Sequence, residues 1–463
     1  MTVNFKTIFL NYSAILLSML VNLILLPFIV KFLDSDYLGL WYVYISLGSL
    51  IHLLDFGFTP TITRYISYLF SGNFSFFTRF LKNNNLHSSQ LIGIFINTSK
   101  FFYMTLSLFI LLFFVIFGFS YLALISNLFD LNIFISWIIY SFAIQLNIYF
   151  SNYSALLKSF NKIDELNFNN IISNIGLFSF SILFLFLGYG LIGLSLALFI
   201  KAILNRVLSL FQLSKFKELT KNNNFTHIVK NYKFIRDALN FIWPLLWKDG
   251  LISLSAYFSS QAVVLFSPFF LTLDQIATYS IGLQLFSAIS SISSSMYRSL
   301  QTNIQYSFAK NDVKSFLGLT SLSNMIYIFL YLSGSFIFMV ISDKFFLLLL
   351  DSKIYEIPLL VLVFLYVFIQ GNHNMFCSFI SNTNNLPYIK SYLISSLFGT
   401  FLSLILISSF DIGPLGLVLG QIIPQLFYNS WYWVSYFLKN YNIKLKEFYF
   451  LGLKSLVKSI LSK

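Results

Sequence analysis

The chain is dominated by long apolar runs that contain no charged residue, such as Phe101 to Phe119 and Leu359 to Ile369. Soluble domains carry roughly a quarter charged residues. Only 10% of this 463-residue chain is charged, and 57% of it is hydrophobic. A membrane β-barrel would instead show alternating polarity over segments of about ten residues. The sequence therefore predicts an all-α polytopic membrane protein.

Twelve segments are apolar enough to be spans, since a spanning helix needs about 20 residues. They cover residues 8–30, 38–61, 101–125, 131–153, 167–187, 190–212, 241–268, 275–297, 316–341, 357–379, 389–410 and 413–437. We expect two six-helix lobes, 1–212 and 241–438. A basic linker at 213–240 joins them on the cytoplasmic side, and a cationic cytoplasmic tail follows at 439–463.

The distribution of charge between the loops predicts the orientation, because basic residues collect in cytoplasmic loops. With the N-terminus inside, the outer connections hold eight acidic and three basic residues. Both termini are therefore expected in the cytoplasm. The net charge of +13 follows from this asymmetry, and no nucleic-acid partner is needed to explain it.

Motifs for covalent chemistry are absent from the sequence. The single Cys377 cannot form an intramolecular disulfide, and no cysteine or histidine pair has the spacing of metal ligands. No phosphate-binding loop of an ATP-driven motor occurs either. We expect no catalytic residue, no metal site and no cofactor, and an enzymatic function is not predicted.

An internal repeat relates the two halves of the chain. A shift of 238 residues lays Asp36 on Asp274, and a shift of 223 lays Gly190-Leu-Ile-Gly193 on Gly413-Pro-Leu-Gly416. Each half has six spans, so both cross the membrane in the same orientation. This predicts a pseudo-twofold axis along the membrane normal and a central cavity between the lobes.

Ionisable residues within spans are candidates for function, because burying a charge in the bilayer is costly. His52 and Asp55 lie three residues apart on one helical face, and Lys248 and Asp249 are neighbours in the seventh span. Asp55 and Lys248 are expected at similar depths, which suggests an ion pair between them. Lys201 in the sixth span is a further candidate.

Structural roles compete with each of these assignments. His52 alone is typical of a hydrogen-bonded core histidine. Lys201 and Arg206 have long side chains that can reach the headgroups. Arg64 and Arg298, at the inner ends of the second and eighth spans, are also explained as topology anchors.

Several motifs resemble the opening of the bacterial O-antigen and polysaccharide flippases of the multidrug/oligosaccharidyl-lipid/polysaccharide (MOP) exporter superfamily. The matching segments are Asp36-Tyr-Leu-Gly39-Leu-Trp41, Leu54-Asp55-Phe56-Gly57, Thr63-Arg64-Tyr65 and Gly190-Leu-Ile-Gly193. The sharp motifs lie in the first 70 residues, and the number of spans extends the likeness to nearly the whole chain.

The resemblance implies a flippase of the bacterial inner membrane that moves a polyprenyl-diphosphate-linked oligosaccharide to the outer leaflet by alternating access. It implies that Lys248, with Arg64, Arg298 and Lys201, binds the diphosphate. Asp55, Asp249 or His52 would couple transport to a proton or sodium gradient. The partners would be the lipid-linked glycan, the bilayer and other membrane proteins of polysaccharide assembly.

Three alternatives remain open at this stage. A multidrug or organic-cation antiporter of the same superfamily would need intramembrane acids, of which Asp55 and Asp249 are the candidates. A membrane glycan polymerase or ligase would be expected to carry a large outer loop, whereas the longest outer connection, about 342–356, is short. An ion channel would need a selectivity filter, and no such signature occurs.

Overall fold

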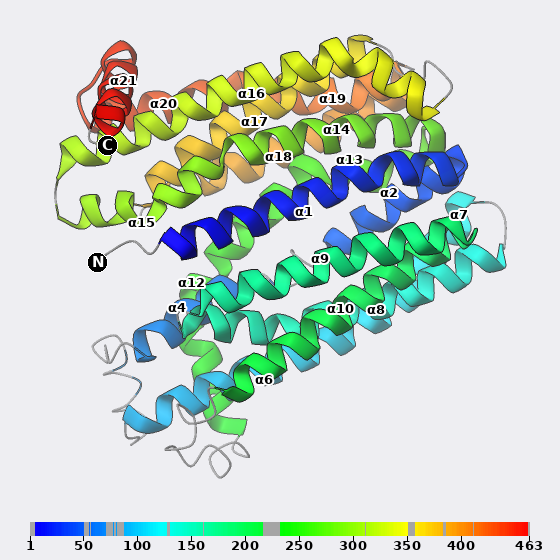
Figure 1. Cartoon of the computed structure of the whole chain (residues 1–463), viewed down its shortest axis with the longest axis horizontal. Helices are drawn as coiled ribbons and strands as arrows, with labels where there is room; N and C mark the ends of the chain where they lie inside the picture. Colours follow the sequence, from blue (N-terminus) through cyan, green and yellow to red (C-terminus); the bar gives the residue numbers. More distant parts are fainter. Residues whose placement is uncertain are drawn as a thin grey trace. The chain divides into compact units, whose positions relative to one another are not determined.

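The structure is a computed structural model of the whole chain. It describes residues 5–50, 55, 57–70, 77, 80, 88–126, 130–160, 162–215, 232–310, 312–350, 357–382, 386–410 and 412–461. Every element in these ranges is a helix (Figure 1), in agreement with the predicted all-α class.

The chain forms two compact units. Unit 1 comprises Met1–Leu33 and Val43–Tyr257, and unit 2 comprises Asp34–Tyr42 and Phe258–Lys463. Two helices, α2 (Ser35–Ser49) and α12 (Tyr232–Ser260), contribute to both units. The lobe, linker and tail boundaries expected from the sequence stay predictions.

Unit 1 is a bundle of long helices. Its remaining α-helices are α1 (Phe5–Phe32), α4 (Phe58–Phe70), α6 (Ser88–Phe113), α7 (Phe119–Ser126), α8 (Leu131–Ser159), α9 (Ile163–Phe186) and α10 (Gly190–Lys215), and a π-helical turn, Phe114–Gly118, joins α6 to α7. α10 packs on both α8 and α9, and α9 packs on α1 (Figure 1). The buried side chains of Val21, Leu177 and Ala197 join α1, α9 and α10 in one apolar cluster.

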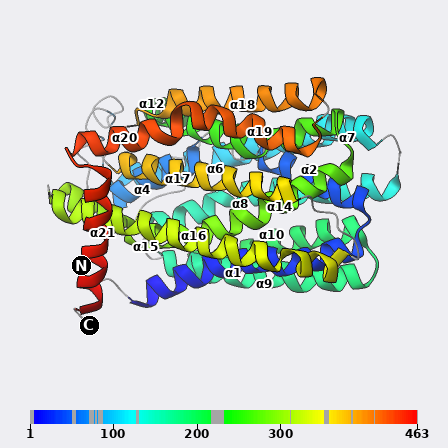
Figure 2. The ribbon, with the colours of Figure 1, turned by 90° about the horizontal axis from the view of Figure 1, so that it is seen from above.

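Unit 2 contains the other helices and ends in one that crosses the bundle. Its α-helices are α13 (Ala262–Phe266), α14 (Leu273–Ser293), α15 (Ser295–Ala309), α16 (Val313–Leu350), α17 (Ile357–Ser381), α18 (Ile389–Ser409), α19 (Pro414–Pro424), α20 (Ser430–Asn440) and α21 (Leu445–Leu461), with a short 3-10 helix at Ser267–Phe269 and a π-helical turn at Gln425–Asn429. Figure 2 shows α16, α17 and α20 along the length of the unit and α21 running across their ends.

Eight helices of the described chain are long and apolar enough to cross a membrane. A ninth span follows if Leu246–Ser260 and Ala262–Phe269, which meet at a 55° bend, are counted as one. These nine coincide with nine of the predicted spans. Two of the other predicted spans correspond to α1 and to α19 with α20. The span predicted at 38–61 is wrong as a single helix, because α2 ends at Ser49 and a turn at Asp55 and Gly57, where Gly57 has a φ of 74°, precedes α4 (Phe58–Phe70). The protein is thus a multi-pass membrane protein, while the orientation of its termini stays a prediction.

Residue burial on α16 is typical of a helix that faces lipid. Its exposed side includes Phe329, Phe336 and Val340, each about two-thirds exposed. Its buried side carries small polar residues such as Ser323 and Asn324. Because lipid is as apolar as these phenylalanines, moving them from lipid into a helix interface would gain little free energy. The interface between helices is instead occupied by small residues, which permit close packing and hydrogen bonding.

Helix boundaries agree with the internal repeat. α14 begins 238 residues after α2, and α15 begins within one residue of the same shift from α4. Gly190 is the first residue of α10 and Gly413 directly precedes α19, and both have positive φ values, 46° and 63°. Residues with a side chain rarely adopt this conformation, which explains why glycine recurs there.

The second glycine of each repeated motif sits against the end of the preceding helix. A Cβ on Gly193 would lie 2.7 Å from Cβ of Phe184, and one on Gly416 would lie 2.9 Å from Cγ2 of Ile407. The two contacted residues are related by the same 223-residue shift as the glycines. The repeated motif therefore specifies a turn and a close helix contact in each unit. The predicted pseudo-twofold axis and central cavity stay predictions.

Candidate functional site

Asp55 occupies the turn before α4, and the first turn of that helix binds its carboxylate. Oδ2 accepts a hydrogen bond from the Thr59 N–H at 3.2 Å, and Oδ1 accepts one from the Thr59 hydroxyl at 3.0 Å. The first N–H groups of a helix lack partners within it, and the helix dipole favours an anion there. The position of the Asp55 carboxylate is therefore fixed by contacts with Thr59, only four residues further along the chain.

Phe58 anchors the turn in the core of unit 1. Its ring is fully buried and stacks on Phe102 of α6, with centroids 3.7 Å apart. Gly57, the residue before it, has a φ of 74°. The turn combines an apolar anchor with a conformation that favours glycine, and this holds the Asp55 backbone in place.

A second acid reaches the same turn from α12. Oδ2 of Asp249 accepts a hydrogen bond from the Thr61 hydroxyl at 3.1 Å. A Cβ on Gly57 would lie 2.9 Å from the Asp249 carbonyl carbon and 3.0 Å from the Gly250 nitrogen, so the two backbones are in contact. Asp55 and Asp249, both predicted from the sequence as site residues, thus meet at the N-terminus of α4. We call this arrangement the α4 acid pair.

Tyr103 extends the α4 acid pair toward α6. Its hydroxyl lies 2.5 Å from the Thr59 hydroxyl, and its side chain is almost fully buried. A continuous chain of polar atoms therefore runs from Tyr103 through Thr59 to Asp55. Sequence reasoning missed Tyr103, because Thr105 and Ser107 in the same apolar run also carry hydroxyls and nothing in the pattern distinguishes them.

Lys248 is not part of this arrangement. Its side chain is exposed, and no ion pair joins it to Asp55 among the contacts that the structure describes. The pairing of Asp55 with Lys248 suggested by the sequence is therefore wrong for this structure. Neighbouring residues on a helix project about 100° apart. Asp249, and not Lys248, lies on the face of α12 that meets α4.

Two further basic residues lie on α10 in unit 1. Lys201 and Arg206 are both half-buried. The Arg206 guanidinium carbon lies 3.8 Å from the ring centroid of Tyr153 and 4.7 Å from that of Phe150. Its Nη1 is buried and has no hydrogen-bond partner in the described part of the chain. Arg206 therefore packs between helices and does not simply extend toward the headgroups.

The remaining predicted site residues are Arg298, Arg64 and His52. Arg298 lies in unit 2, where its exposed guanidinium donates to the Ser294 hydroxyl at 3.1 Å. Arg64 lies on α4, but its side chain is outside the described residues, and so is the whole of His52. No cluster of three or more histidine, cysteine or acidic residues that could hold a metal ion occurs in the part of the chain that the structure describes.

Comparison with known proteins identifies the fold. No protein-family model matches the chain, and no curated protein matches its sequence. An inward-facing multidrug resistance MATE-family transporter of the MOP superfamily superimposes with a TM-score of 0.63 over 92% of this chain and 94% of its own, at 10% identity. The MATE transporter VcmN of Vibrio cholerae, as a mutant, gives a TM-score of 0.64 over 96% and 98% at 14% identity. This chain has the MOP transporter fold.

A third structure with the MOP fold is also similar to this chain. It is a MOP superfamily transporter from Pyrococcus furiosus, whose binding pocket is described as having reversed polarity. The TM-score is 0.55 over 93% of this chain and 95% of that one, at 10% identity. All three proteins are transporters and none is an enzyme. The MOP fold predicted from the resemblance is confirmed, whereas the polysaccharide-flippase family stays a prediction.

Proposed function

We propose that the protein is a flippase that moves a polyprenyl-diphosphate-linked oligosaccharide from the cytoplasmic to the outer leaflet by alternating access. The supporting observation is that Lys201, Arg206, Lys248 and Arg298 make no ion pair with any carboxylate that the structure describes. Cations in or near spans that have no internal counter-ion are suited to an anionic substrate. A diphosphate supplies that charge and accepts several hydrogen bonds from lysine and arginine.

Lys248 is the residue that we assign to the headgroup. It is exposed on α12 next to Trp247, which is 41% exposed. An accessible lysine can contact a phosphate without first breaking an internal ion pair. The polyprenyl tail stays in lipid while the polar head crosses, so no covalent bond has to change and no nucleophile or metal is required.

The α4 acid pair is the proposed coupling site. Asp55 and Asp249 are held by neutral hydroxyls of Thr59 and Thr61 and lie on different elements of unit 1. Binding a proton or a sodium ion at one carboxylate would change its hydrogen bonds to α4 and thereby the contact between α4 and α12. The Tyr103 hydroxyl extends this network and offers a place for a proton beyond Thr59.

A multidrug or organic-cation antiporter is the second candidate. The observation that favours it is the α4 acid pair itself, because two carboxylates can attract a cationic substrate as well as a coupling ion. The two functions differ in the charge of the cargo. Removing Lys248 should impair the flippase and leave a cation antiporter nearly unaffected.

The test is translocation of a fluorescent polyprenyl-diphosphate oligosaccharide in proteoliposomes, read with a membrane-impermeant quencher. Hydrogen bonds to charged groups contribute about 1.5–3 kcal/mol, so Lys248→Ala should slow flipping by roughly tenfold or more. Lys248→Arg should retain most of the rate. Lys314→Ala removes an exposed lysine at the start of α16 and is the matched control. Gradient-driven efflux of organic cations without glycolipid flipping would contradict the proposal.

A further inference from the structure

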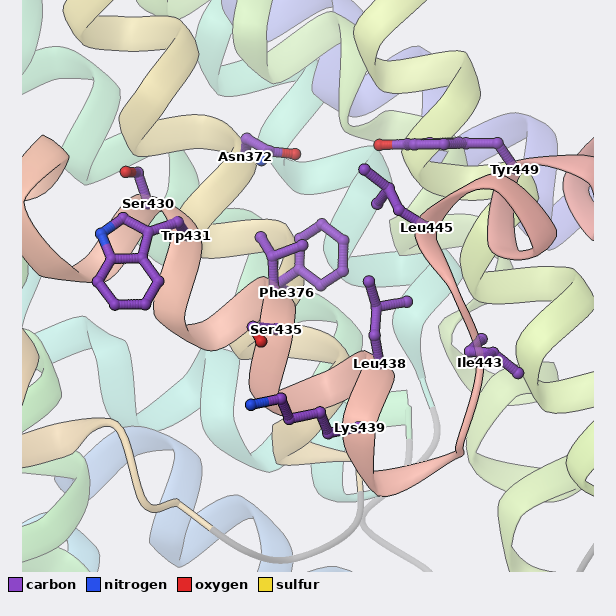
Figure 3. A pocket seen from close by; sticks show the side chains of 11 residues that line it. Asn372, Phe376, Ser430, Trp431, Ser435, Leu438, Lys439, Ile443, Leu445 and Tyr449 are labelled. Atoms are coloured by element: carbon purple, nitrogen blue, oxygen red, sulfur yellow. The ribbon is translucent and has the colours of Figure 1, made fainter.

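A cavity of about 500 Å³ opens in unit 2 among α17, α20 and the start of α21 (Figure 3). This volume lies in the usual range of sites for small ligands, about 300–1,000 Å³. Phe376 and Leu445 supply apolar surface, and Trp431 presents an indole that is 56% exposed. None of the residues discussed for transport lines this cavity.

One wall of the cavity is polar and fixed by hydrogen bonds. The Tyr449 hydroxyl donates to Oδ1 of Asn324 at 2.9 Å, and Nδ2 of Asn324 donates to Oδ1 of Asn372 at 3.0 Å. Asn372 and Tyr449 both line the cavity. Since the Asn372 oxygen is occupied by this bond, its N–H₂ group is the part available to an acceptor such as a phosphate oxygen.

Lys439 supplies the positive charge. It lies in the last turn of α20, lines the cavity and forms no ion pair with a described carboxylate (Figure 3). The acid nearest in sequence, Glu447, accepts a hydrogen bond from the Lys444 N–H at the start of α21. The cavity thus combines an unpaired ammonium group, amide and hydroxyl groups, and an apolar surface.

α21 has the character of a helix that lies in the membrane interface. Figure 2 shows it running across the ends of the spans of unit 2. Buried Phe448 fixes it there, with its ring against Phe376, and the Ser321 hydroxyl bonds to the Phe448 carbonyl. Its exposed residues include one acid, Glu447, and a larger set of apolar and basic side chains, namely Leu445, Lys446, Phe450, Leu453 and Lys454. Such a mixture favours binding to an anionic bilayer surface.

We propose that this cavity binds the phosphate headgroup of an anionic phospholipid from the surrounding bilayer, with α21 lying in the interface beside it. Lys439 would contact the phosphate, and Asn372, at the other end of the cavity (Figure 3), would donate to an ester oxygen of the same lipid. Phe376, Leu445 and Trp431 would pack against the glycerol and the upper acyl chains. The positive charge of Lys439 in the cavity lining favours an anionic lipid over a zwitterionic one. This inference does not depend on the transported substrate.

The experiment uses the full chain in phosphatidylcholine nanodiscs with increasing fractions of brominated phosphatidylglycerol, which quenches nearby tryptophan. The signal is the difference between the protein and its Trp431→Phe variant, so it reports the cavity. Quenching should saturate at a low fraction of the brominated lipid. One lysine near an anionic lipid surface is worth roughly fivefold in affinity, and Lys439→Gln should shift half-saturation by about that factor.

Two variants separate the cavity from general surface charge and from misfolding. Lys439→Arg keeps the charge and should retain the wild-type curve. Lys454→Gln removes an exposed lysine of α21 that does not line the cavity and should shift the curve less than twofold. Equal shifts for Lys439→Gln and Lys454→Gln, or equal quenching by brominated phosphatidylcholine, would overturn the proposal.

Competition identifies the source of the phosphate. Inorganic phosphate in the buffer should leave the quenching unchanged, and relief of quenching by it would mean a site for a soluble anion. Undecaprenyl phosphate should compete no better than unbrominated phosphatidylglycerol at equal fraction. If undecaprenyl phosphate competes more strongly than phosphatidylglycerol, the cavity is a site for a polyprenyl phosphate, and the assignment to a bilayer phospholipid is overturned. The quenching assay does not depend on transport, so a protein that flips no glycolipid should still give the same quenching curve.

Discussion

A single added methyl group at Gly57 should disturb the α4 acid pair, because Gly57 lies in the turn that joins Asp55 to α4. With a φ of 74°, an alanine there would adopt the left-handed conformation, which costs roughly 1–2 kcal/mol. Its Cβ would also lie 2.9 Å from the Asp249 carbonyl carbon, which is backbone and cannot rotate away. Relieving such a contact costs about 1–3 kcal/mol. Together these terms predict that Gly57→Ala lowers the free energy of unfolding by about 2–5 kcal/mol.

Gly188→Ala is the matched control for this prediction. Gly188 is also in unit 1 and has a φ of 80°, but nothing lies within 4 Å of the Cβ position. It should therefore lose only the conformational part, roughly 1–2 kcal/mol. The difference between the two variants measures the contact between the Gly57 turn and α12.

The assay is reversible unfolding in mixed micelles of a mild detergent and dodecyl sulfate, with transport measured in proteoliposomes. Thr61→Val should separately remove the hydrogen bond to Asp249, at a cost of about 1.5–3 kcal/mol. If Gly57→Ala unfolds no more easily than Gly188→Ala, the close approach of α4 and α12 is refuted. A transport defect in Gly57→Ala that Thr61→Val does not share would refute the role given to the Thr61–Asp249 bond.

Three other predictions concern single side chains. Tyr103→Phe removes the hydroxyl next to Thr59 and should weaken the dependence of transport on the ion gradient while lowering the unfolding free energy by only about 1 kcal/mol, which transport at several imposed gradients would detect. Arg206→Lys loses the planar stacking on two aromatic rings and should cost about 0.5–1 kcal/mol in the same unfolding assay, and an unchanged midpoint would mean that the stacking contributes nothing. Thr272→Ala breaks the capping box at the start of α14 and should cost about 1 kcal/mol, whereas Thr272→Ser should restore most of the loss.

The positions of the helices could be read from the sequence with good accuracy. Apolar runs define spans because each backbone polar group in lipid must be bonded within its own helix, so length and hydropathy suffice to locate them. The glycine motif at 190–193 and 413–416 was likewise informative, because its positive φ values and its close helix contacts depend on nearby residues. These local requirements recur at the same shift in both halves.

The candidate site could be predicted only in part. Asp55 and Asp249 were found because a charge within a span is rare and therefore noticeable. Lys248 was assigned the wrong partner, because depth along a helix says nothing about the direction in which a side chain projects. Tyr103 and Thr59 were missed, because hydroxyls are common in the spans of this chain and carry no charge.

The sequence by itself determined the membrane-spanning class, the approximate positions of most spans and the repeated glycine motif, since these follow from hydropathy and local sequence. Only the tertiary structure decided that Asp249 shares the first turn of α4 with Asp55 and that Tyr103 joins them. The cavity beside α21 likewise became visible only there. Such features depend on the rotation and contact of helices far apart in the chain, which packing determines and which no local pattern encodes.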